Sequence, residues 1–517
     1  MIPFSDFQGN TLATLSLPTA VFKAYDIRGT VPEQLNAAFA HSLGLALAQQ
    51  ACAQNIPTLV VGYDGRLSSP ELAQALQAGL MEGGVNTIDL GMVPTPLVYF
   101  ATHTQKTGSG VAITGSHNPP NYNGFKIMMG GKTLHGEGVQ ALREIMEDLP
   151  APDIDSGEAG QARWHPQGVP LQGSVAPKES VPPKGPVSPK GSAPPNRPVP
   201  RGSRQALSLI DAYIDRISAD VKLARPMKIA IDCGNGVGGA VAPQLFAALG
   251  CEVDTLFCEV DGHFPNHHPD PADPHNLQDL IRHVKNSDCE LGLAFDGDAD
   301  RLGVVTKSGE IIWPDRQLIL YACDILQRAP GSTIIFDVKC SRHVARAIEQ
   351  AGGHPLMWQT GHSMIKAKLA ETGAPLAGEM SGHIFFKERW FGFDDGLYTG
   401  ARLLEILSRH TNPSATLEAL PQGISTPELK LEMREGEPHV LIKHLQNEGK
   451  FPSAQSINTI DGVRAEYTDG FGLARASNTT PVVVLRFEGD THDALQRIQA
   501  EFRRALLALA PNLTLPF

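Results

Sequence analysis

The sequence has 517 residues and a formal net charge of −12, with 42% hydrophobic and 19% charged residues, which is ordinary for a soluble globular protein. A chain of this length exceeds one ordinary core, so we expect three or four domains. The acidic balance disfavours a nucleic-acid partner, which would favour a basic patch.

The seven cysteines are scattered and odd in number, and none forms a Cys-x-x-Cys pair. This spacing disfavours a disulfide framework or a structural zinc site and fits a reducing compartment. Residues 1–16 lack the basic start and apolar core of a signal peptide, and no apolar run is long enough to span a membrane. We therefore expect a cytoplasmic protein without membrane contact.

Residues 58–91 carry the first regular pattern: an apolar β-rich run, a polar turn, an amphipathic helix ending in glycine, and a second β-rich run. Residues 228–258 and 333–359 repeat the same order. Three β-α-β units predict α/β sheets, whose functional sites lie at the C-terminal ends of strands.

The first candidate functional loop is TGSHNPP at residues 114–120, directly after the apolar run GVAI. Gly115 permits a sharp turn, but Ser116 is a weak nucleophile without a metal, a base or prior phosphorylation. The same loop places His117 beside the serine and continues to Lys126. A plain hydrophilic turn is the alternative to a nucleophile loop.

Residues 175–200 stand apart, because they hold nine prolines in a six-residue period and almost nothing apolar to bury. We predict a disordered or polyproline-II linker over residues 166–204. A ligand for a proline-recognition domain is the alternative.

The second β-α-β unit carries two signals. Gly234, Gly236 and Gly239 match the dinucleotide fingerprint, but a lone match arises easily by chance, and we prefer close helix–strand packing. The second signal is DGDADR at residues 296–301, after the strand ELGLAF.

Three alternating carboxylates in a tight loop can point at one hard cation. A calcium EF-hand is excluded, because its sixth and twelfth loop positions are Arg301 and Lys307 here and no helix precedes the loop. Mg²⁺ beside a phosphate, with the Ser116 oxygen as a further ligand, is the better account. A solvated acidic turn is the alternative, although such close carboxylates repel one another without a cation. The carboxylates are Asp296, Asp298 and Asp300.

The loop GEMSGH at residues 378–383 follows another apolar run and offers a carboxylate, a hydroxyl and an imidazole, which suit sugar hydroxyls. From Ile457 several strands follow in succession, and then one amphipathic helix from His492 to about Leu507, which predicts an α+β fold. Between two of these strands Arg475 precedes hydroxyl and amide side chains, a pattern typical of a phosphate cradle. The cradle residues are Arg475, Ser477, Asn478 and Thr479, with Arg486 eleven positions beyond Arg475.

These four loops, in this order, resemble those of the α-D-phosphohexomutase family, and most of all its bifunctional phosphomannomutase/phosphoglucomutase branch. The resemblance covers nearly the whole chain outside the N-terminal extension and the proline-rich insert, and it includes YDIRG at residues 25–29 and GYDGR at residues 62–66. It implies three related α/β domains with mixed sheets, plus a C-terminal α+β domain, around a central cleft. It also implies an enzyme that interconverts the 1- and 6-phosphates of mannose and/or glucose.

The family reaction would run through a phosphoserine at Ser116 and a hexose 1,6-bisphosphate, with Mg²⁺ held by Ser116, Asp296, Asp298 and Asp300. Lys126 and His383 both stay open as the proton-transferring group. The catalytic residues implied are Arg28, Ser116, His117, Lys126, Arg301 and His383. The substrate-binding residues implied are Tyr25, Lys339, His362, Glu379, Ser381, His383, Arg475, Ser477, Asn478, Thr479 and Arg486.

The domains would be I with the phosphoserine loop, II with the Mg²⁺ loop, III with the sugar loop and IV with the phosphate loop. Their predicted bounds are 1–165, 205–310, 311–422 and 423–517. We expect a monomer that binds a small-molecule sugar phosphate, with a hexose 1,6-bisphosphate as activator, and hinge motion of domain IV. The alternatives are a phosphoglucosamine-type mutase, a metal-dependent sugar phosphatase and a non-catalytic sugar-phosphate binder.

Overall fold

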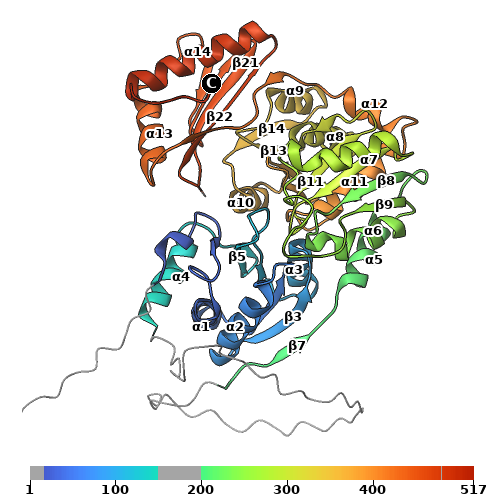
Figure 1. The fold of residues 1–517 in the computed structure, drawn as a ribbon, viewed down its shortest axis with the longest axis vertical. Coiled ribbons are helices and arrows are strands. Elements are labelled where there is room, and N and C mark those ends of the chain that lie inside the picture. The colour runs from blue at the N-terminus through green and yellow to red at the C-terminus, as the bar shows by residue number, and fades with distance from the viewer. Residues whose placement is uncertain (1–16, 150–199, 479) are drawn as a thin grey trace, which may run out of the picture.

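The computed structural model describes residues 17–149, 200–478 and 480–517, and Figure 1 shows four sheet-based units following one another along the chain. Residues 166–199 of the predicted linker and the predicted phosphate contact Thr479 lie outside the described residues. In the described part, no helix combines the length and apolarity needed to cross a membrane.

The first sheet has the strand order β1-β5-β4-β2-β3-β7, with β6 beside β5. Because β7 pairs with β3, this sheet reaches across the predicted boundary after residue 204. The strands are β1 (Ile27–Thr30), β2 (Thr58–Tyr63), β3 (Asn86–Met92), β4 (Gly110–Ile113), β5 (Tyr122–Met129), β6 (Lys132–Thr133) and β7 (Arg204–Ala206). The helices are η1 (Thr19–Val21), α1 (Ala37–Ala53), α2 (Ser69–Glu82), α3 (Thr95–Thr104) and α4 (Glu137–Asp148).

The second sheet has the order β12-β11-β10-β8-β9. Its strands are β8 (Lys228–Asp232), β9 (Glu252–Leu256), β10 (Leu291–Phe295), β11 (Leu302–Thr306) and β12 (Ile311–Ile312). Its helices are α5 (Ile210–Asp220), η2 (Val237–Ala240), α6 (Ala242–Ala248), η3 (Pro274–Leu277) and α7 (Gln278–Asn286).

The third sheet has the order β14-β13-β15-β16. Its strands are β13 (Thr333–Asp337), β14 (His354–Trp358), β15 (Leu376–Gly378) and β16 (Ile384–Phe386). The helices of this part are α8 (Pro314–Arg328), α9 (Arg342–Gln350), α10 (His362–Thr372), α11 (Gly396–Leu407) and α12 (Pro413–Glu418).

All three sheets contain the same four-strand unit, which confirms the predicted repeat and the mixed sheets. The units are β3-β2-β4-β5, β9-β8-β10-β11 and β14-β13-β15-β16. In each unit three strands are parallel and the last is antiparallel to its neighbour. The loop into the antiparallel strand, which leaves the C-terminal end of a parallel strand, carries a predicted motif in every case: the serine loop, the acidic loop and the sugar loop.

The C-terminal sheet is antiparallel, with the order β17-β22-β21-β20-β19 and β18 beside β22. The predicted run of strands and final helix are confirmed, whereas β17, β18 and α13 were not predicted. The elements are β17 (Ile424–Ser425), β18 (Leu429–Glu432), α13 (Glu437–Glu448), β19 (Ser456–Asn458), β20 (Val463–Tyr467), β21 (Gly470–Ala476), β22 (Val482–Gly489) and α14 (His492–Leu509). This unit has its own apolar core, while one large core runs through parts of the first three.

The glycines that match the dinucleotide fingerprint make close backbone contacts. A Cβ on Gly236 would lie 2.9 Å from the carbonyl oxygen of Gly297 in the acidic loop. A Cβ on Gly239 would lie 2.0 Å from the carbonyl oxygen of Cys258. Any side chain here would push the acidic loop or the end of β9 away, so close packing accounts for these glycines.

Helices α1 and α2 also meet through glycine, which generates a stability prediction. A Cβ on Gly79 would lie 2.1 Å from the His41 carbonyl oxygen of α1. We expect Gly79→Ala to force the helices apart and to cost about 1–3 kcal/mol, as overpacking does. A thermal melt should show a lower melting temperature, whereas Gln74→Ala, on the exposed face of α2, should leave it unchanged. Equal melting temperatures for both variants would contradict the close packing.

Candidate active site

Ser116 lies in the loop between β4 and β5, with a φ of 49°, and its side chain is buried. Its hydroxyl donates a hydrogen bond to Asp296 Oδ2 over 3.1 Å and accepts one from Arg301 Nη2 over 3.2 Å. His117 Nδ1 lies 3.2 Å from the same oxygen and also contacts Arg301. Burial, and then the charge of Arg301, hold the pKa of His117 well below its usual range. The serine oxygen therefore has a carboxylate, a guanidinium and a neutral imidazole around it.

The buried guanidinium of Arg66 holds the serine loop in this shape. Asp64 accepts hydrogen bonds from Arg66 Nε at 3.2 Å and from the Gly115 amide at 3.1 Å, which joins the arginine to the loop from the other side. A Cβ on Gly115 would lie 2.4 Å from Arg66 Nε, so the glycine permits this approach. Arg66 donates to the carbonyl oxygens of Ser116 (2.8 Å), Asn118 (2.6 Å), Pro119 (2.5 Å) and Tyr122 (2.9 Å).

The acidic loop after β10 buries its three carboxylates completely. Lys126 Nζ, from β5, pairs with Asp298 Oδ2 at 2.7 Å and with Asp300 Oδ2 at 2.5 Å. Arg301 Nε pairs with Asp296 Oδ2 at 3.0 Å. The structure therefore brings the predicted serine, lysine, arginine and carboxylates into one cluster.

Burial and charge act against each other in this cluster. Burial raises the pKa of Asp296 to about 8, although Arg301 opposes the shift. Burial alone would raise the pKa of Asp298 as well, but the ammonium of Lys126 outweighs it and the pKa is lowered. The carboxylates of Asp298 and Asp300 raise the pKa of Lys126 well above its usual value, against the effect of burial. Lys126 is thus a fixed positive charge in this arrangement.

The three carboxylates can hold a divalent metal ion. One oxygen from each can be chosen so that all lie within 4.8 Å of one another. Asp298 Oδ1 and Asp300 Oδ1 are buried and accept no hydrogen bond from any residue in the described part of the chain. Buried carboxylate oxygens without hydrogen-bond donors are costly, and a hard cation satisfies them. The acidic loop therefore fits the predicted metal site.

The sugar loop between β15 and β16 touches the acidic loop directly. His383 and Arg301 form an isolated antiparallel bridge, and His383 Nδ1 lies 3.6 Å from Asp300 Oδ1 and 3.2 Å from Asp394 Oδ2. These two carboxylates raise the pKa of His383 against the effect of burial. Glu379 Oε1 accepts a hydrogen bond from the Gly361 amide at 2.6 Å, and burial raises the pKa of Glu379 to about 7. Ser381 lies half-buried in the same loop.

Tyr25 of the first unit meets the third and fourth units. Its ring packs edge-on against His362, with 5.7 Å between centroids, and His362 stacks on His383 at 5.6 Å. Asn478 lies within hydrogen-bonding reach of the Tyr25 hydroxyl. Arg475 Nε donates to Asp461 Oδ2 at 2.9 Å, while its buried Nη2 has no hydrogen-bond partner among the residues described. Four units thus contribute side chains to one continuous set.

Some predicted residues are engaged in other pairs. Lys339 Nζ donates to Glu428 Oε1 at 2.7 Å, and Arg486 Nη2 donates to Asp315 Oδ2 at 3.3 Å. Both pairs join the third unit to the fourth. The remaining residues lie in or beside the predicted loops: Arg28 donates to Asn118 Oδ1 at 2.7 Å, and Ser477 accepts from the Thr480 amide at 3.3 Å.

Three contributors to the site were not predicted as functional. Arg66 lies in the segment GYDGR, which resembles the family but was given no functional role from the sequence. Thr95, at the start of α3, donates to Asp298 Oδ2 at 2.6 Å. Asp394 accepts from Lys366 at 2.9 Å and faces His383. The sequence does carry one indication of Asp394: two aspartates stand in succession before α11. Asp395 caps that helix, which leaves Asp394 without a structural role at the helix end.

A buried serine and a cluster of carboxylates that can hold a metal ion, supplied by neighbouring units, are typical of a phosphoryl-transfer enzyme. Family models agree, and they match four consecutive segments of the chain. Those for phosphoglucomutase/phosphomannomutase alpha/beta/alpha domains I, II and III match residues 19–152, 211–309 and 313–423, and that for the C-terminal domain matches residues 428–505. The chain belongs to the phosphoglucomutase/phosphomannomutase family.

Relatives and solved structures support this membership over nearly the full length. A phosphoglucomutase of Neisseria gonorrhoeae is 52% identical, over 97% of this chain and 99% of the relative. A phosphomannomutase/phosphoglucomutase of Pseudomonas aeruginosa is 48% identical, over 98% and 100%. The crystal structure of a phosphoglucomutase/phosphomannomutase family protein from Burkholderia thailandensis superposes with a TM-score of 0.84 at 50% identity, covering 97% of this chain and all of that one.

The role of Arg66 can be tested without an activity assay. Lysine has one nitrogen and cannot reach four carbonyl oxygens, and a hydrogen bond from a charged group contributes about 1.5–3 kcal/mol. We expect Arg66→Lys to speed hydrogen exchange of the amides in residues 114–124 by roughly tenfold or more. Arg204→Lys, which alters a half-exposed arginine paired with Asp89, is the control and should leave this loop unchanged. Unaltered exchange in Arg66→Lys would refute the role.

Proposed function

We propose that the protein interconverts the 1- and 6-phosphates of mannose and/or glucose through a phosphoserine at Ser116 and a hexose 1,6-bisphosphate. The observation that carries the proposal is the position of the Ser116 hydroxyl, which bonds Asp296 and Arg301 inside the acidic cluster. A second cationic loop at Arg475 belongs to a separate unit, which suits a reaction that must hold two phosphates in turn. Relatives named for both sugars support the substrate class.

In this proposal Ser116 carries the phosphoryl group, and Lys126 and Arg301 neutralise the charge of its oxygens. Phosphoryl transfer depends mostly on positioning and charge stabilisation, so fixed cations beside the serine suit it. Asp296, Asp298 and Asp300, with the Ser116 oxygen, would hold Mg²⁺, which when bound would stabilise the negative charge that develops on the phosphoryl oxygens.

Lys126 and His383 are both retained as proton carriers, and their surroundings differ. The ammonium of Lys126 bonds two carboxylates, so two of its three N–H donors are already committed. The His383 ring has one nitrogen toward Asp394 and stacks on His362, which fixes its orientation. Arg28 and His117 lie on the serine side of the same cluster and would orient the reacting group.

The sugar would lie between the serine and the fourth unit. Glu379 and Ser381 would bind its 3- and 4-hydroxyls, and His362, Tyr25 and Lys339 would contact it from neighbouring loops. Arg475, with an unpaired buried nitrogen, would bind the phosphate that is not transferred. The other residues proposed for this phosphate are Ser477, Asn478, Thr479 and Arg486.

We also propose that the domains span residues 1–165, 205–310, 311–422 and 423–517. The protein would be a cytoplasmic monomer, and a hexose 1,6-bisphosphate would activate it. A phosphoglucosamine-type mutase and a metal-dependent sugar phosphatase are the alternatives that the activity assay must separate.

The assay supplies glucose 1-phosphate, mannose 1-phosphate or glucosamine 1-phosphate with Mg²⁺ and a trace of glucose 1,6-bisphosphate. We expect the first two to give 6-phosphates without release of inorganic phosphate. Ser116→Ala should lower turnover by roughly 10³-fold or more, as loss of a nucleophile does, while calorimetry still detects sugar-phosphate binding. Ser332→Ala, in a loop before β13, is the control. Phosphate release matching substrate loss would identify a phosphatase, and near-full activity of Ser116→Ala would exclude the phosphoserine.

Domain IV, residues 423–517, should close on a substrate that carries two phosphates. It has a separate core, and ion pairs at Lys339 and Arg486 join it to its neighbour. We expect small-angle scattering to show a smaller radius of gyration with glucose 1,6-bisphosphate. Inorganic phosphate alone cannot bridge the two sites and should leave the radius unchanged. The same radius with and without the bisphosphate would rule out closure.

A further inference from the structure

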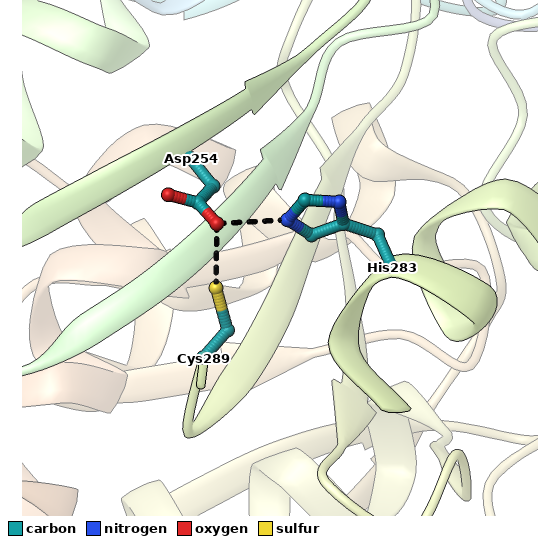
Figure 2. Close-up of side chains that lie close together, drawn as sticks. All are labelled: Asp254, His283 and Cys289. Carbon is teal, nitrogen blue, oxygen red and sulfur yellow. Dashed lines mark hydrogen bonds and ion pairs between the residues drawn. The ribbon is translucent and has the colours of Figure 1, made fainter. Parts of the chain in front are cut away.

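A second group of metal-ligating side chains lies in domain II, away from the acidic loop. Figure 2 shows Asp254 on β9, His283 on α7 and Cys289, just before β10, pointing toward one another. Asp254 Oδ2 lies 2.9 Å from His283 Nε2 and 3.3 Å from Cys289 Sγ. One donor atom from each residue can be chosen so that all lie within 4.8 Å of one another. Three different elements therefore present oxygen, nitrogen and sulfur to one point.

The group stands at the opposite end of β10 from the active site. Cys289 precedes this strand and Asp296 follows it, and five residues of strand span roughly 16 Å. The position gives this group no place in the proposed phosphoryl transfer.

We propose that Asp254, His283 and Cys289 bind a thiophilic divalent cation, Zn²⁺ above all. Imidazole and thiolate are preferred ligands of Zn²⁺, and a carboxylate completes a common three-residue set. Mg²⁺ prefers oxygen alone, so the donor set separates this site from the acidic loop. The sequence did not predict a zinc site here, because its cysteines are isolated. The three ligands come from distant positions in the chain and include only one sulfur.

The charges around the group favour a cation. Lys228 Nζ lies 3.8 Å from Asp254 Oδ1, but it pairs more closely with Glu252 at 2.8 Å and Asp288 at 2.6 Å. The ammonium of Lys228 therefore lies near Oδ1 of Asp254, and Oδ2 is available to bind the ion. The ammonium of Lys307 also lies close by, on the carbonyl oxygens of Val284 and Ser287. Three carboxylates against two ammonium groups still leave a net negative charge around the group when His283 is neutral.

The ion can be reached from solvent through His283. Its side chain is 35% exposed and borders a surface cavity of about 460 Å³, which neither Asp254 nor Cys289 lines. Asp254 is 29% exposed, whereas Cys289 is fully buried behind them. The partial exposure of His283 and Asp254 gives water access as a fourth ligand, which a zinc site with three protein ligands needs.

A nucleophilic role for Cys289 fits the geometry less well. Its thiol donates to the carboxylate of Asp254 rather than to the imidazole, and a carboxylate is too weak a base to take the proton of a thiol readily. Burial, with Asp254 beside it, raises the pKa of Cys289 to about 11, so the free thiol is neutral and unreactive. On metal binding the S–H bond breaks, a sulfur–metal bond forms and the proton leaves to solvent.

Cobalt(II) tests the site, because it replaces Zn²⁺ and gives a near-ultraviolet charge-transfer band when a thiolate binds it. The full-length protein is titrated with Co²⁺ in excess Mg²⁺, which occupies the acidic loop. We expect the band at one equivalent, its loss in Cys289→Ser, and its retention in Cys258→Ser. Cys258 is the matched control, since its Sγ lies 3.5 Å from Cys233 Sγ and forms the competing thiol pair.

Zn²⁺ itself gives the second readout. Calorimetry should find one site, and His283→Gln should weaken it by more than the roughly 10- to 100-fold that loss of an outer-shell partner costs. Circular dichroism checks that each variant is folded. A band that persists in Cys289→Ser would move the site elsewhere. No thiolate band in folded wild-type protein would leave the group as a hydrogen-bonded network and overturn the proposal.

Discussion

The ammonium of Lys126, held between Asp298 and Asp300, is the interaction on which the rest of the site depends. Three carboxylates buried together would repel one another, and a buried charge without a partner is strongly destabilising. The pairs join positions 172 and 174 residues apart, so β5 of the first sheet must dock on the acidic loop of the second. That docking carries the serine loop with it, because Ser116 lies between β4 and β5. Ser116, the proposed nucleophile, and the candidate metal site are thus brought together by charge compensation.

A shared topology explains how three unrelated-looking motifs converge. Each follows the parallel strand that pairs with the antiparallel edge of its four-strand unit, where the C-terminal end opens a short loop. Backbone contacts then fix these loops against each other: a Cβ on Gly297 would lie 2.4 Å from the Ser116 carbonyl oxygen. The bridge between Arg301 and His383 adds the sugar loop to the pair. The repeated topology therefore determines where the three loops lie, and the motifs supply their functional side chains.

Periodicity made the repeat and the C-terminal fold predictable, because amphipathic helices and apolar strands leave regular traces in sequence. The serine loop and the acidic loop were predictable for a second reason, since their residues are adjacent. Arg66 and Asp394 were not, because a single buried charge has no period and its partners lie far away in the chain. The same limit hid the Asp254 group, whose members are 29 and 35 residues from the shared carboxylate. Short edge strands such as β7 and β17 also carry too few residues to show alternation.

The contacts between the fourth unit and the third are compatible with the closure that we propose. Arg464, on β20, donates to the carbonyl oxygens of Val338 and Cys340 and lies 3.7 Å from the Phe471 ring centroid. The apolar cluster at this boundary is small, with Val338, Phe471 and Leu473 as its buried members. Polar contacts can be exchanged for water at modest cost, unlike a large apolar face. Arg464 and Arg486 anchor the sheet to its neighbour, whereas Arg475, on the same face, keeps a nitrogen unpaired. The face of the sheet that attaches the fourth unit therefore also carries Arg475, which we propose binds a phosphate.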